Sequence, residues 1–256
     1  MTISRNRSAE AVDVRVEDLH KSFGSQKVLK GVSLEVKPGE IFVLMGSSGS
    51  GKSVLLKHIV GLEQADRGTV TIGGHNAADP ATRDAISTAM VFQAGALFNS
   101  MTVFDNLALF LREHRLCSPS EIRQRVEAAM EALGIKDAAK KLPATLSGGM
   151  RKRVAVARAI VMQPQVILYD EPTSELDPVT GATVAELISQ VRHDTGATSF
   201  VVTHDRDLAL GIADRIALLA HGELIFVGTP DEVRNTTDET LRSFMNPQVK
   251  AVPARS

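Results

Sequence analysis

The chain contains one stretch, residues 46–53, whose residue types and spacing suit a bound phosphate group. Its sequence is Gly-Ser-Ser-Gly-Ser-Gly-Lys-Ser. Glycines let backbone N–H groups converge on phosphate oxygens without obstruction by side chains. Lys52 is placed to reach the β- and γ-phosphates of a nucleotide, and Ser53 is placed to hold Mg²⁺. We call this stretch the phosphate loop, and its residues are Gly46, Ser47, Ser48, Gly49, Ser50, Gly51, Lys52 and Ser53.

The segments on either side of the phosphate loop decide whether the match has a structural meaning. Residues 41–45 form an apolar run typical of a buried strand, and residues 54–60 read as a helix. The N-terminus of such a helix carries a partial positive charge that favours an anion. A glycine-rich turn can match the pattern by accident, but the order strand, loop, helix favours a nucleotide site.

Two adjacent carboxylates follow another predicted strand. Residues 166–169 are an apolar run typical of a parallel strand buried on both faces, and Asp170 and Glu171 come directly after it. Ligands bind at the carboxyl ends of strands in open α/β sheets. We expect Asp170 to coordinate Mg²⁺ and Glu171 to orient or deprotonate an attacking water. An isolated acidic pair is more often a solvated turn, but the phosphate loop upstream favours the functional interpretation.

Other groups belong to the same sheet edge if the predicted strands lie side by side. His204 follows the apolar run 199–203 and can contact a γ-phosphate there, and Gln93 follows a short strand at 90–92. Residues 146–150, which we call the Ser-Gly-Gly turn, start a helix that extends to about residue 162. Such a turn at a helix N-terminus is a second anion-binding arrangement. Taken alone, it is equally compatible with a capped loop.

The remaining pattern predicts an alternating α/β chain with a helical insertion. Residues 103–144 show helical periodicity and no strand signal, with Ser120 as the expected N-cap and Gly134 as a helix stop. Phe23 lies between two predicted strands, where core packing is one explanation for it. The other predicted elements are strands at 12–16, 32–36 and 68–74, a helix at 180–192, a hairpin of 216–219 with 224–227, and a final helix at 231–245.

The composition limits the class of protein. The chain has 256 residues, 43% of them hydrophobic, and a formal net charge of −1, so nothing in it demands a nucleic-acid partner. One cysteine, Cys117, excludes an intramolecular disulfide and fits a reducing compartment. The first residues lack a secretory pattern, and no apolar run approaches the roughly 20 residues of a membrane span. We expect a protein that is soluble by itself, with flexible tails at 1–11 and 247–256.

In their order along the chain, these motifs resemble those of the ATP-binding cassette (ABC) ATPases, and the resemblance covers nearly the whole chain. The phosphate loop resembles the Walker A motif, and Asp170 and Glu171 resemble the Walker B aspartate and the catalytic glutamate. Gln93 is similar to the Q-loop glutamine, residues 174–177 to the D-loop, and His204 to the switch histidine. The Ser-Gly-Gly turn resembles the signature motif, which separates this family from other P-loop NTPases.

The resemblance implies a P-loop ABC ATPase fold of the α/β class, with a RecA-like core, an antiparallel β subdomain and a helical subdomain. The nucleotide-binding domain would cover residues 12–246, with the helical subdomain at about 95–162. Phe23 would stack on adenine. The sequence departs from the family pattern at Met150, where Gln is usual, and at Glu175, where Ala is usual. Neither departure removes a catalytic group, so we expect an active ATPase.

ATP and Mg²⁺ are the cofactors that the resemblance implies. Two copies would pair head to tail, with each ATP between the phosphate loop of one copy and the Ser-Gly-Gly turn of the other. The residues that the turn would contribute are Ser147, Gly148 and Gly149. The residues implied to act in hydrolysis are Glu171 as general base, Gln93, Lys52 and His204. The residues implied to hold Mg²⁺ are Ser53, Gln93 and Asp170.

A finer resemblance concerns residues 92–98 and their continuation to residue 114. Together with the Ser-Gly-Gly turn, they look like the ATPases of Mce-type lipid transport systems, including the Mla phospholipid pathway of Gram-negative bacteria. This implies a membrane permease that contacts the segment after Gln93, a periplasmic Mce-type lipid-binding protein, and a location on the cytoplasmic face of the inner membrane. An apolar segment near Phe98 suits a helix-in-groove contact, although core packing explains Phe104 equally well.

Two other functions stay open on the sequence. An ABC importer ATPase for another substrate, such as amino acids or metals, is distinguished only by the segment after Gln93 and by Met150. A soluble ABC ATPase that acts on ribosomes or DNA is disfavoured by the single cassette, the lack of a long coiled coil and the balanced charge. The basic run at residues 151–153 is interpreted as a solvated helix face.

Overall fold

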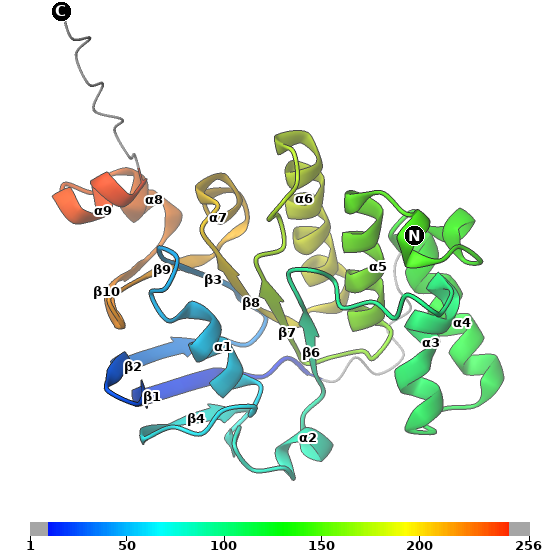
Figure 1. Ribbon diagram of the computed structural model, residues 1–256, viewed down its shortest axis with the longest axis horizontal. Coiled ribbons are helices and arrows are strands. Elements are labelled where there is room, and N and C mark those ends of the chain that lie inside the picture. The colour runs from blue at the N-terminus through cyan, green and yellow to red at the C-terminus, as the bar shows by residue number, and fades with distance from the viewer. Residues whose placement is uncertain (1–9, 246–256) are drawn as a thin grey trace, which may run out of the picture.

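The computed structural model describes residues 10–245, which form two sheets with helices around them (Figure 1). In the larger sheet the strand order is β10-β9-β3-β8-β7-β6, with neighbours parallel except for β10 against β9. Its strands are β3 (Ile41–Met45), β6 (Thr88–Val91), β7 (Val166–Asp170), β8 (Thr198–Thr203), β9 (Arg215–Ala220) and β10 (Glu223–Gly228). The smaller, antiparallel sheet consists of β2 (Gln26–Val36), β1 (Val14–Phe23), β4 (Arg67–Ile72) and β5 (His75–Asn76), in that order.

The helices confirm the predicted α/β class with a separate helical part. Helices α3 and α4 lie at one end of the molecule and the antiparallel sheet at the other (Figure 1). No helix within residues 10–245 is long and apolar enough to cross a membrane. The helices are α1 (Lys52–Ile59), α2 (Thr82–Ala85), α3 (Val103–Glu113), α4 (Pro119–Ala132), α5 (Gly148–Ile160), α6 (Pro178–Thr195), α7 (Arg206–Ile212), α8 (Pro230–Arg234) and α9 (Glu239–Met245).

The central strands are buried on both faces, which explains why they read as continuous apolar runs. Alternate side chains of β3 point to opposite faces of the sheet. Ile41, Val43 and Met45 join a core that includes residues of α3 to α7. Phe42 and Leu44 join a second core that includes α1 and the antiparallel sheet. The larger sheet therefore holds the helical part and the antiparallel part in fixed positions on its two faces.

The first two strands are longer than the sequence pattern predicted. The expected strand at 12–16 is the start of β1, and that at 32–36 is the end of β2. The alternation fails in between because the register of β1 with β2 shifts after Val16, and Asp18 adopts a φ of 46° there. Such a bulge moves the following side chains to the other face, so a period of two cannot follow the strand through it.

The helical part differs from the prediction at one cap. The N-cap of α4 is Ser118 and not Ser120 as predicted, because Ser118 and Glu121 form a reciprocal capping box and Pro119 takes the first helical position. Gly134 was correctly predicted as a stop: it follows the α4 C-cap with a φ of 63°.

The predicted final helix at 231–245 is wrong, since the structure has two short helices there. Thr229 caps α8 in a second capping box, which starts the helix one residue earlier than predicted. Helix α8 ends at Arg234, and the Asp238 carboxylate then accepts a hydrogen bond from the Leu241 N–H near the start of α9. Side-chain bonds of this kind compete with a continuous helix.

The loop between β6 and α3 is held by one buried side chain, Asn106. It is 0% exposed, and its amide oxygen accepts a hydrogen bond from the Phe98 N–H at 2.8 Å. Its amide nitrogen donates to backbone carbonyls of Phe98, Met101 and Thr102 at 2.9–3.1 Å. The path of the chain after Gln93 is therefore fixed from within the helical part.

We predict that Asn106→Ala lowers the free energy of unfolding by roughly 2–4 kcal/mol, because the loop loses four part-buried hydrogen bonds to its backbone. Urea denaturation followed by circular dichroism measures this change. Asn99→Ala is the matched control, since Asn99 is an exposed residue of the same loop and its loss should cost less than about 0.5 kcal/mol. A cost for Asn106→Ala as small as that of the control would contradict the role given to Asn106.

Candidate active site

The phosphate loop connects β3 to α1, in the predicted order of strand, loop and helix. Two of its glycines are required by packing. A Cβ on Gly46 would lie 2.4 Å from the Leu219 carbonyl oxygen, and one on Gly51, at a φ of 109°, would lie 2.8 Å from the Leu29 side chain. No side chain fits at these distances, so the loop keeps its backbone close to its neighbours and open toward a ligand.

Lys52 points its ammonium back into the phosphate loop. Its side chain is buried, and its Nζ donates hydrogen bonds to the carbonyl oxygens of Gly46 at 2.7 Å and Ser47 at 3.1 Å. The same nitrogen lies 3.8 Å from Oε1 of Glu171. Burial lowers the pKa of the Lys52 ammonium, and the carboxylates of Glu171 and Asp170 offset part of that decrease. The phosphate loop thus encloses a positive charge where a phosphate would lie.

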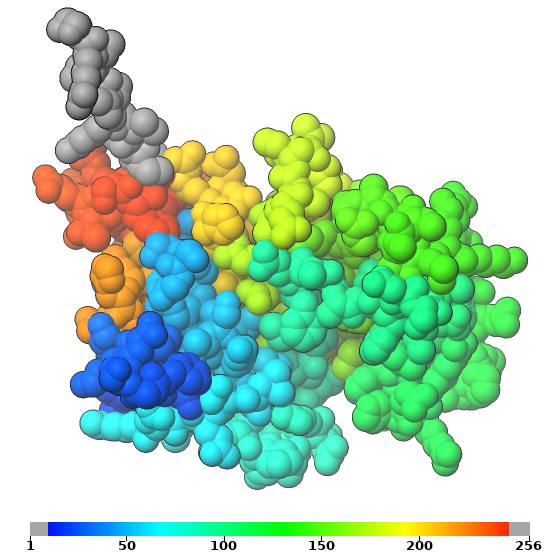
Figure 2. All heavy atoms as spheres, viewed as in Figure 1, coloured from blue at the N-terminus to red at the C-terminus, as the bar shows by residue number. Residues whose placement is uncertain are grey.

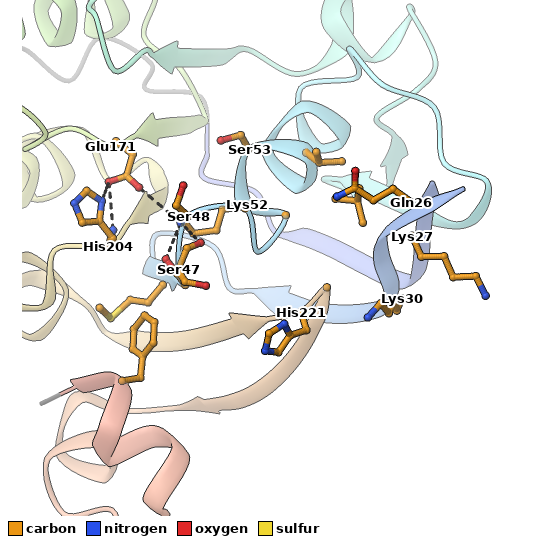
Figure 3. A pocket seen from close by; sticks show the side chains of 18 of the residues that line it. Gln26, Lys27, Lys30, Ser47, Ser48, Lys52, Ser53, Glu171, His204 and His221 are labelled. Atoms are coloured by element: carbon orange, nitrogen blue, oxygen red, sulfur yellow. Dashed lines mark hydrogen bonds and ion pairs between the residues drawn. The ribbon is translucent and has the colours of Figure 1, made fainter. Parts of the chain in front are cut away.

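Glu171 is held by hydrogen bonds at the end of β7 (Figure 3). Its Oε2 lies 2.9 Å from Nδ1 of His204, and it accepts bonds from the His204 N–H at 3.2 Å and the Thr203 hydroxyl at 3.3 Å. An ionised carboxylate only accepts, so Nδ1 carries the proton of this contact. Glu171 also adopts a φ of 48°, a strained conformation for a residue other than glycine. Oε2 is therefore fixed, and Oε1 faces the Lys52 ammonium at 3.8 Å.

Asp170 suits a cation. Its Oδ1 is buried and has no hydrogen-bond partner within residues 10–245. Burial and, next, the charge of Glu171 raise the pKa of this carboxyl above its ordinary value. A buried carboxylate oxygen without a donor is stabilised by a hard cation such as Mg²⁺. The other two predicted ligands, the Ser53 hydroxyl and the Gln93 amide, also offer oxygen atoms, the donor type that this ion prefers.

We predict that Asp170→Asn stabilises the nucleotide-free protein while abolishing Mg²⁺-dependent hydrolysis. A raised pKa means that the ionised carboxylate destabilises the fold, so at neutral pH its removal should raise the Tm by roughly 2–4 °C. The gain should disappear as the pH falls through the raised pKa, because the wild-type carboxyl is then neutral too. Thermal unfolding between pH 4 and 8, with a parallel phosphate-release assay, measures both effects. A lower Tm at neutral pH would refute this reading of Asp170.

The control is Asp177→Asn. Asp177 is exposed and caps α6, and hydrogen bonds from Thr180 lower the pKa of its carboxyl. Removal of its charge should therefore give no stabilisation at neutral pH.

A cavity of 940 Å³ opens beside the phosphate loop and collects most of the predicted groups. Gln93, Glu171 and His204 line it together with the loop. Figure 3 shows Glu171 and His204 beside Ser48 and Lys52 of the loop. It continues past the antiparallel sheet, and the lining residues there that sequence reasoning missed are Gln26, Lys27, Val28, Lys30 and His221. One feature of the sequence could have indicated that these residues line the cavity. Both hairpins, β1–β2 and β9–β10, connect strands beside the phosphate loop.

Phe23 lies at the end of β1, and its ring is 48% exposed, so the core-packing explanation for it is wrong. The ammonium of Lys21 lies 5.0 Å from the centroid of the ring. Phe23 does not line the described cavity, although Gln26 across the β1–β2 turn does. Its stacking on adenine stays a proposal.

The Ser-Gly-Gly turn lies away from the phosphate loop of its own chain. Ser147 is the exposed N-cap of α5, and its hydroxyl accepts a hydrogen bond from the Met150 N–H at 3.3 Å. A Cβ on Gly149 would lie 2.8 Å from the methyl group of Thr180, so the turn packs closely on the start of α6. None of Ser147, Gly148 and Gly149 is among the residues that line the cavity.

The interpretation of residues 151–153 as a solvated face is wrong for two of the three. Arg151 is exposed, but Lys152 is buried and Arg153 half-buried. The guanidinium groups of Arg151 and Arg153 donate to the carbonyls of Leu146 and Leu133, and the Lys152 ammonium donates to that of Gln93. Lys and Arg side chains have long apolar stems that can be buried while the charged group reaches a carbonyl. A run of basic residues in the sequence does not show whether the stems are buried in this way.

Comparison with known families decides what this site belongs to. Residues 29–174, more than half of the chain, match the sequence profile described as ABC transporter. The chain belongs to the ABC transporter family. As a member, it is an ATP-binding subunit that hydrolyses ATP with Mg²⁺, and subunits of this family pair with one another and act with a membrane permease.

Similar ABC subunits carry names of different transport systems. The probable ribonucleotide transport ATP-binding protein mkl of Mycobacterium leprae is 40% identical over 245 residues, which are 94% of this chain and 70% of mkl. The trehalose/maltose import ATP-binding protein MalK of Thermococcus litoralis is 42% identical over 225 residues, 86% of this chain and 60% of MalK. The names of the relatives thus share ATP binding and differ in substrate.

Solved structures show the same fold. CbiO1 of Clostridium perfringens, part of the ABC transporter complex CbiONQ, matches with a TM-score of 0.82 and 28% identity over 93% of this chain and 96% of its own. The ATP-binding cassette MJ0796, solved as a dimer in a post-hydrolysis state with ADP and Pi, matches with a TM-score of 0.76 and 32% identity over 85% of this chain and 98% of its own. These neighbours confirm the predicted ABC ATPase fold.

Proposed function

We propose that this ABC ATPase drives the movement of phospholipids through a separate permease, as a peripheral subunit on the cytoplasmic face of a bacterial inner membrane. The observation that carries the proposal is the largely exposed apolar segment on both sides of Gln93, residues 92–98. The side chains of Phe92 and Phe98 are 39% and 50% exposed. Residues 92–98 are also the part of the sequence that resembles Mce-type lipid transport ATPases.

The segment is presented to a partner by the fold. Gln93 lines the ATP cavity, while Asn106 holds the chain at Phe98. The segment lies at the surface between the helical part and the rest of the molecule, in the blue-green region of Figure 2. Phe104, by contrast, is half-buried against the core, with the Arg112 guanidinium 5.7 Å from its ring centroid. A permease helix would therefore meet Phe98 and leave Phe104 in place.

The roles of the site residues follow from their geometry. Lys52 neutralises charge on the β- and γ-phosphates, since its ammonium already lies within the phosphate loop. Thr203 and His204 fix Oε2 of Glu171, so Oε1 is the atom that accepts the proton of the attacking water. Mg²⁺, when bound, supplies positive charge at the phosphate oxygens. The residues proposed to hold it are Ser53, Gln93 and Asp170.

The site needs a second copy of the chain. The Ser-Gly-Gly turn lies at a helix N-terminus, with Ser147 exposed and Gly148 and Gly149 half-buried, but it lies outside the cavity of its own subunit. A two-fold, head-to-tail pair would place Ser147, Gly148 and Gly149 of one copy on the ATP of the other. The dimeric state of the MJ0796 structure supports this arrangement.

A second candidate is an importer of a polar solute. It is favoured by the names of relatives that are 40–42% identical, which include ribonucleotide and trehalose/maltose transport. Action on ribosomes or DNA has less support, because the net charge of −1 gives no footprint for nucleic acid.

The test is to purify the ATPase from membranes in mild detergent and to identify its partners and bound lipids by mass spectrometry. We expect a permease, an Mce-type lipid-binding protein and co-purified phospholipid. A matched preparation of Phe98→Asp should lose the permease while it keeps nucleotide binding. Recovery with a solute-binding protein for a polar nutrient, or with ribosomes, would overturn the proposal.

A further inference from the structure

Lys152 of α5 carries a buried ammonium group at the edge of the sheet where the catalytic groups lie. The residue is 8% exposed. Its Nζ donates a hydrogen bond to the backbone carbonyl of Gln93 and lies 3.5 Å from that of Glu171. Both contacts are to backbone carbonyls. Lys152 therefore fixes the backbone of the two loops and not the side chains of Gln93 and Glu171.

The two carbonyls occupy equivalent places on neighbouring strands. Strands β6 and β7 are parallel, and Val91 pairs with Tyr169 at their ends. Gln93 and Glu171 each follow two residues later. The Lys152 ammonium thus contacts the backbone just after both strands. It fixes Gln93, a proposed Mg²⁺ ligand, relative to Glu171, the proposed general base.

Three carboxylates act electrostatically on this ammonium. Burial lowers the pKa of Lys152, and the charges of Glu175, then Asp170 and Glu171, offset part of the decrease. Glu175 lies in the loop before α6, at a φ of 63°, where the family pattern has Ala. Among the carboxylates that raise the pKa of Lys152, Glu175 therefore has the largest effect, and Glu175 is the residue that departs from the family pattern.

The same helix carries the Ser-Gly-Gly turn. Helix α5 begins at Gly148, and Lys152 lies one turn further on. Near its other end, the Arg158 guanidinium donates to the carbonyls of Gly95 at 3.0 Å and Ala96 at 2.7 Å. A movement of the turn would therefore move Lys152 with it and pull on the segment after Gln93.

We propose that Lys152 is a positioning residue that couples the Ser-Gly-Gly turn and Glu175 to the Gln93 and Glu171 loops of the same subunit. ATP bound by the partner copy contacts the turn, and Lys152 transmits the resulting shift of α5 to the hydrolytic groups of its own subunit. Hydrolysis at one site thereby depends on occupancy of the other. The inference rests on the proposed head-to-tail pair.

The test compares Lys152→Met, which keeps the apolar stem, with Lys152→Arg, which keeps the charge. For Lys152→Met we expect kcat to fall roughly ten- to hundredfold, because the base and the metal ligand are misplaced. The affinity for a fluorescent ATP analogue should change by less than about twofold, and the Hill coefficient of hydrolysis should fall to ~1. Lys152→Arg should recover the Hill coefficient. Arg153→Met is the control, since Arg153 lies on the same helix but its guanidinium donates to the Leu133 carbonyl at the end of α4.

Two results would overturn the proposal. The first is a cooperative, wild-type kcat in Lys152→Met. The second is an equal loss of kcat and of ATP affinity, which would mark a purely structural role. If the proposed head-to-tail pair itself is wrong, wild-type hydrolysis will be non-cooperative and Glu171→Gln will stay monomeric with ATP. These two results distinguish a failure of the pair from a failure of the role proposed for Lys152.

A double-mutant cycle with Glu175→Ala gives an independent readout if Lys152→Met fails to fold. Glu175→Ala should change the Hill coefficient when residue 152 is Lys. The change should be smaller when it is Arg, since the guanidinium places its charge differently. The same change in every background would overturn the link between Glu175 and Lys152.

Discussion

Replacing Glu171 by Gln is expected to leave ATP binding intact and to slow hydrolysis by roughly 10²–10⁴-fold, the usual contribution of a general base. Gln keeps the shape of the side chain and can still accept hydrogen bonds from Thr203 and His204. It cannot take a proton from water at Oε1. ATP should therefore persist between two copies and hold them together, because the contacts of the Ser-Gly-Gly turn with the nucleotide are no longer broken by turnover.

Light scattering after size-exclusion chromatography, with and without Mg-ATP, tests this directly. Glu171→Gln should elute as a dimer with ATP and as a monomer without it, while the wild type should stay mainly monomeric as it turns over. Glu186→Gln, an exposed carboxylate on α6, is the matched control and should behave as the wild type. Near-normal phosphate release by Glu171→Gln would remove the role of general base from this residue.

Lys52→Ala is expected to weaken ATP binding by roughly ten- to two-hundredfold, since charge-assisted hydrogen bonds contribute about 1.5–3 kcal/mol. The wild-type ammonium lies inside the phosphate loop, 2.7 Å from the Gly46 carbonyl. Without it, the phosphates meet only backbone dipoles. Burial partly desolvates the Lys52 ammonium and thereby lowers its pKa, which means that the charged form does not stabilise the nucleotide-free fold. Loss of Lys52 should therefore not reduce the Tm of the nucleotide-free protein.

Titration with a fluorescent ATP analogue gives the dissociation constant for each variant. Lys57→Ala serves as the control: it removes an exposed lysine from the same helix and should leave the constant within about twofold of the wild type. Unchanged affinity of Lys52→Ala would show that the phosphates do not lie in this loop.

The sequence was most informative where a motif coincides with a continuous apolar run. Strands β3, β7 and β8 are buried on both faces, so their carboxyl ends, and with them Lys52, Glu171 and His204, could be predicted to converge. The strand β1 was cut short in the prediction because a bulge near Asp18 inverts its alternation. The cap of α4 was misplaced because two serines, Ser118 and Ser120, compete, and only Ser118 stands three residues before a glutamate.

Contacts between side chains and distant backbone could not be predicted. Lys152 looks like a surface lysine in the sequence, but it reaches a carbonyl 59 residues away. Lys30 and His221 enter the cavity only because the β1–β2 and β9–β10 hairpins come together in space, where the Lys30 N–H donates to the Gly222 carbonyl at 2.9 Å. Pairings between distant segments leave no periodic signal in either one, so they appear only once the fold is known.

The most direct test of the proposed work of this ATPase is its substrate-stimulated hydrolysis. The co-purified membrane complex would be kept in mild detergent and depleted of lipid, and phosphate release would be measured with phospholipid, ribonucleotide, sulfate or trehalose supplied in turn, with Glu171→Gln as the background. We expect faster hydrolysis with phospholipid and none of this acceleration with the polar solutes. Acceleration by a polar solute, with no response to phospholipid, would contradict it.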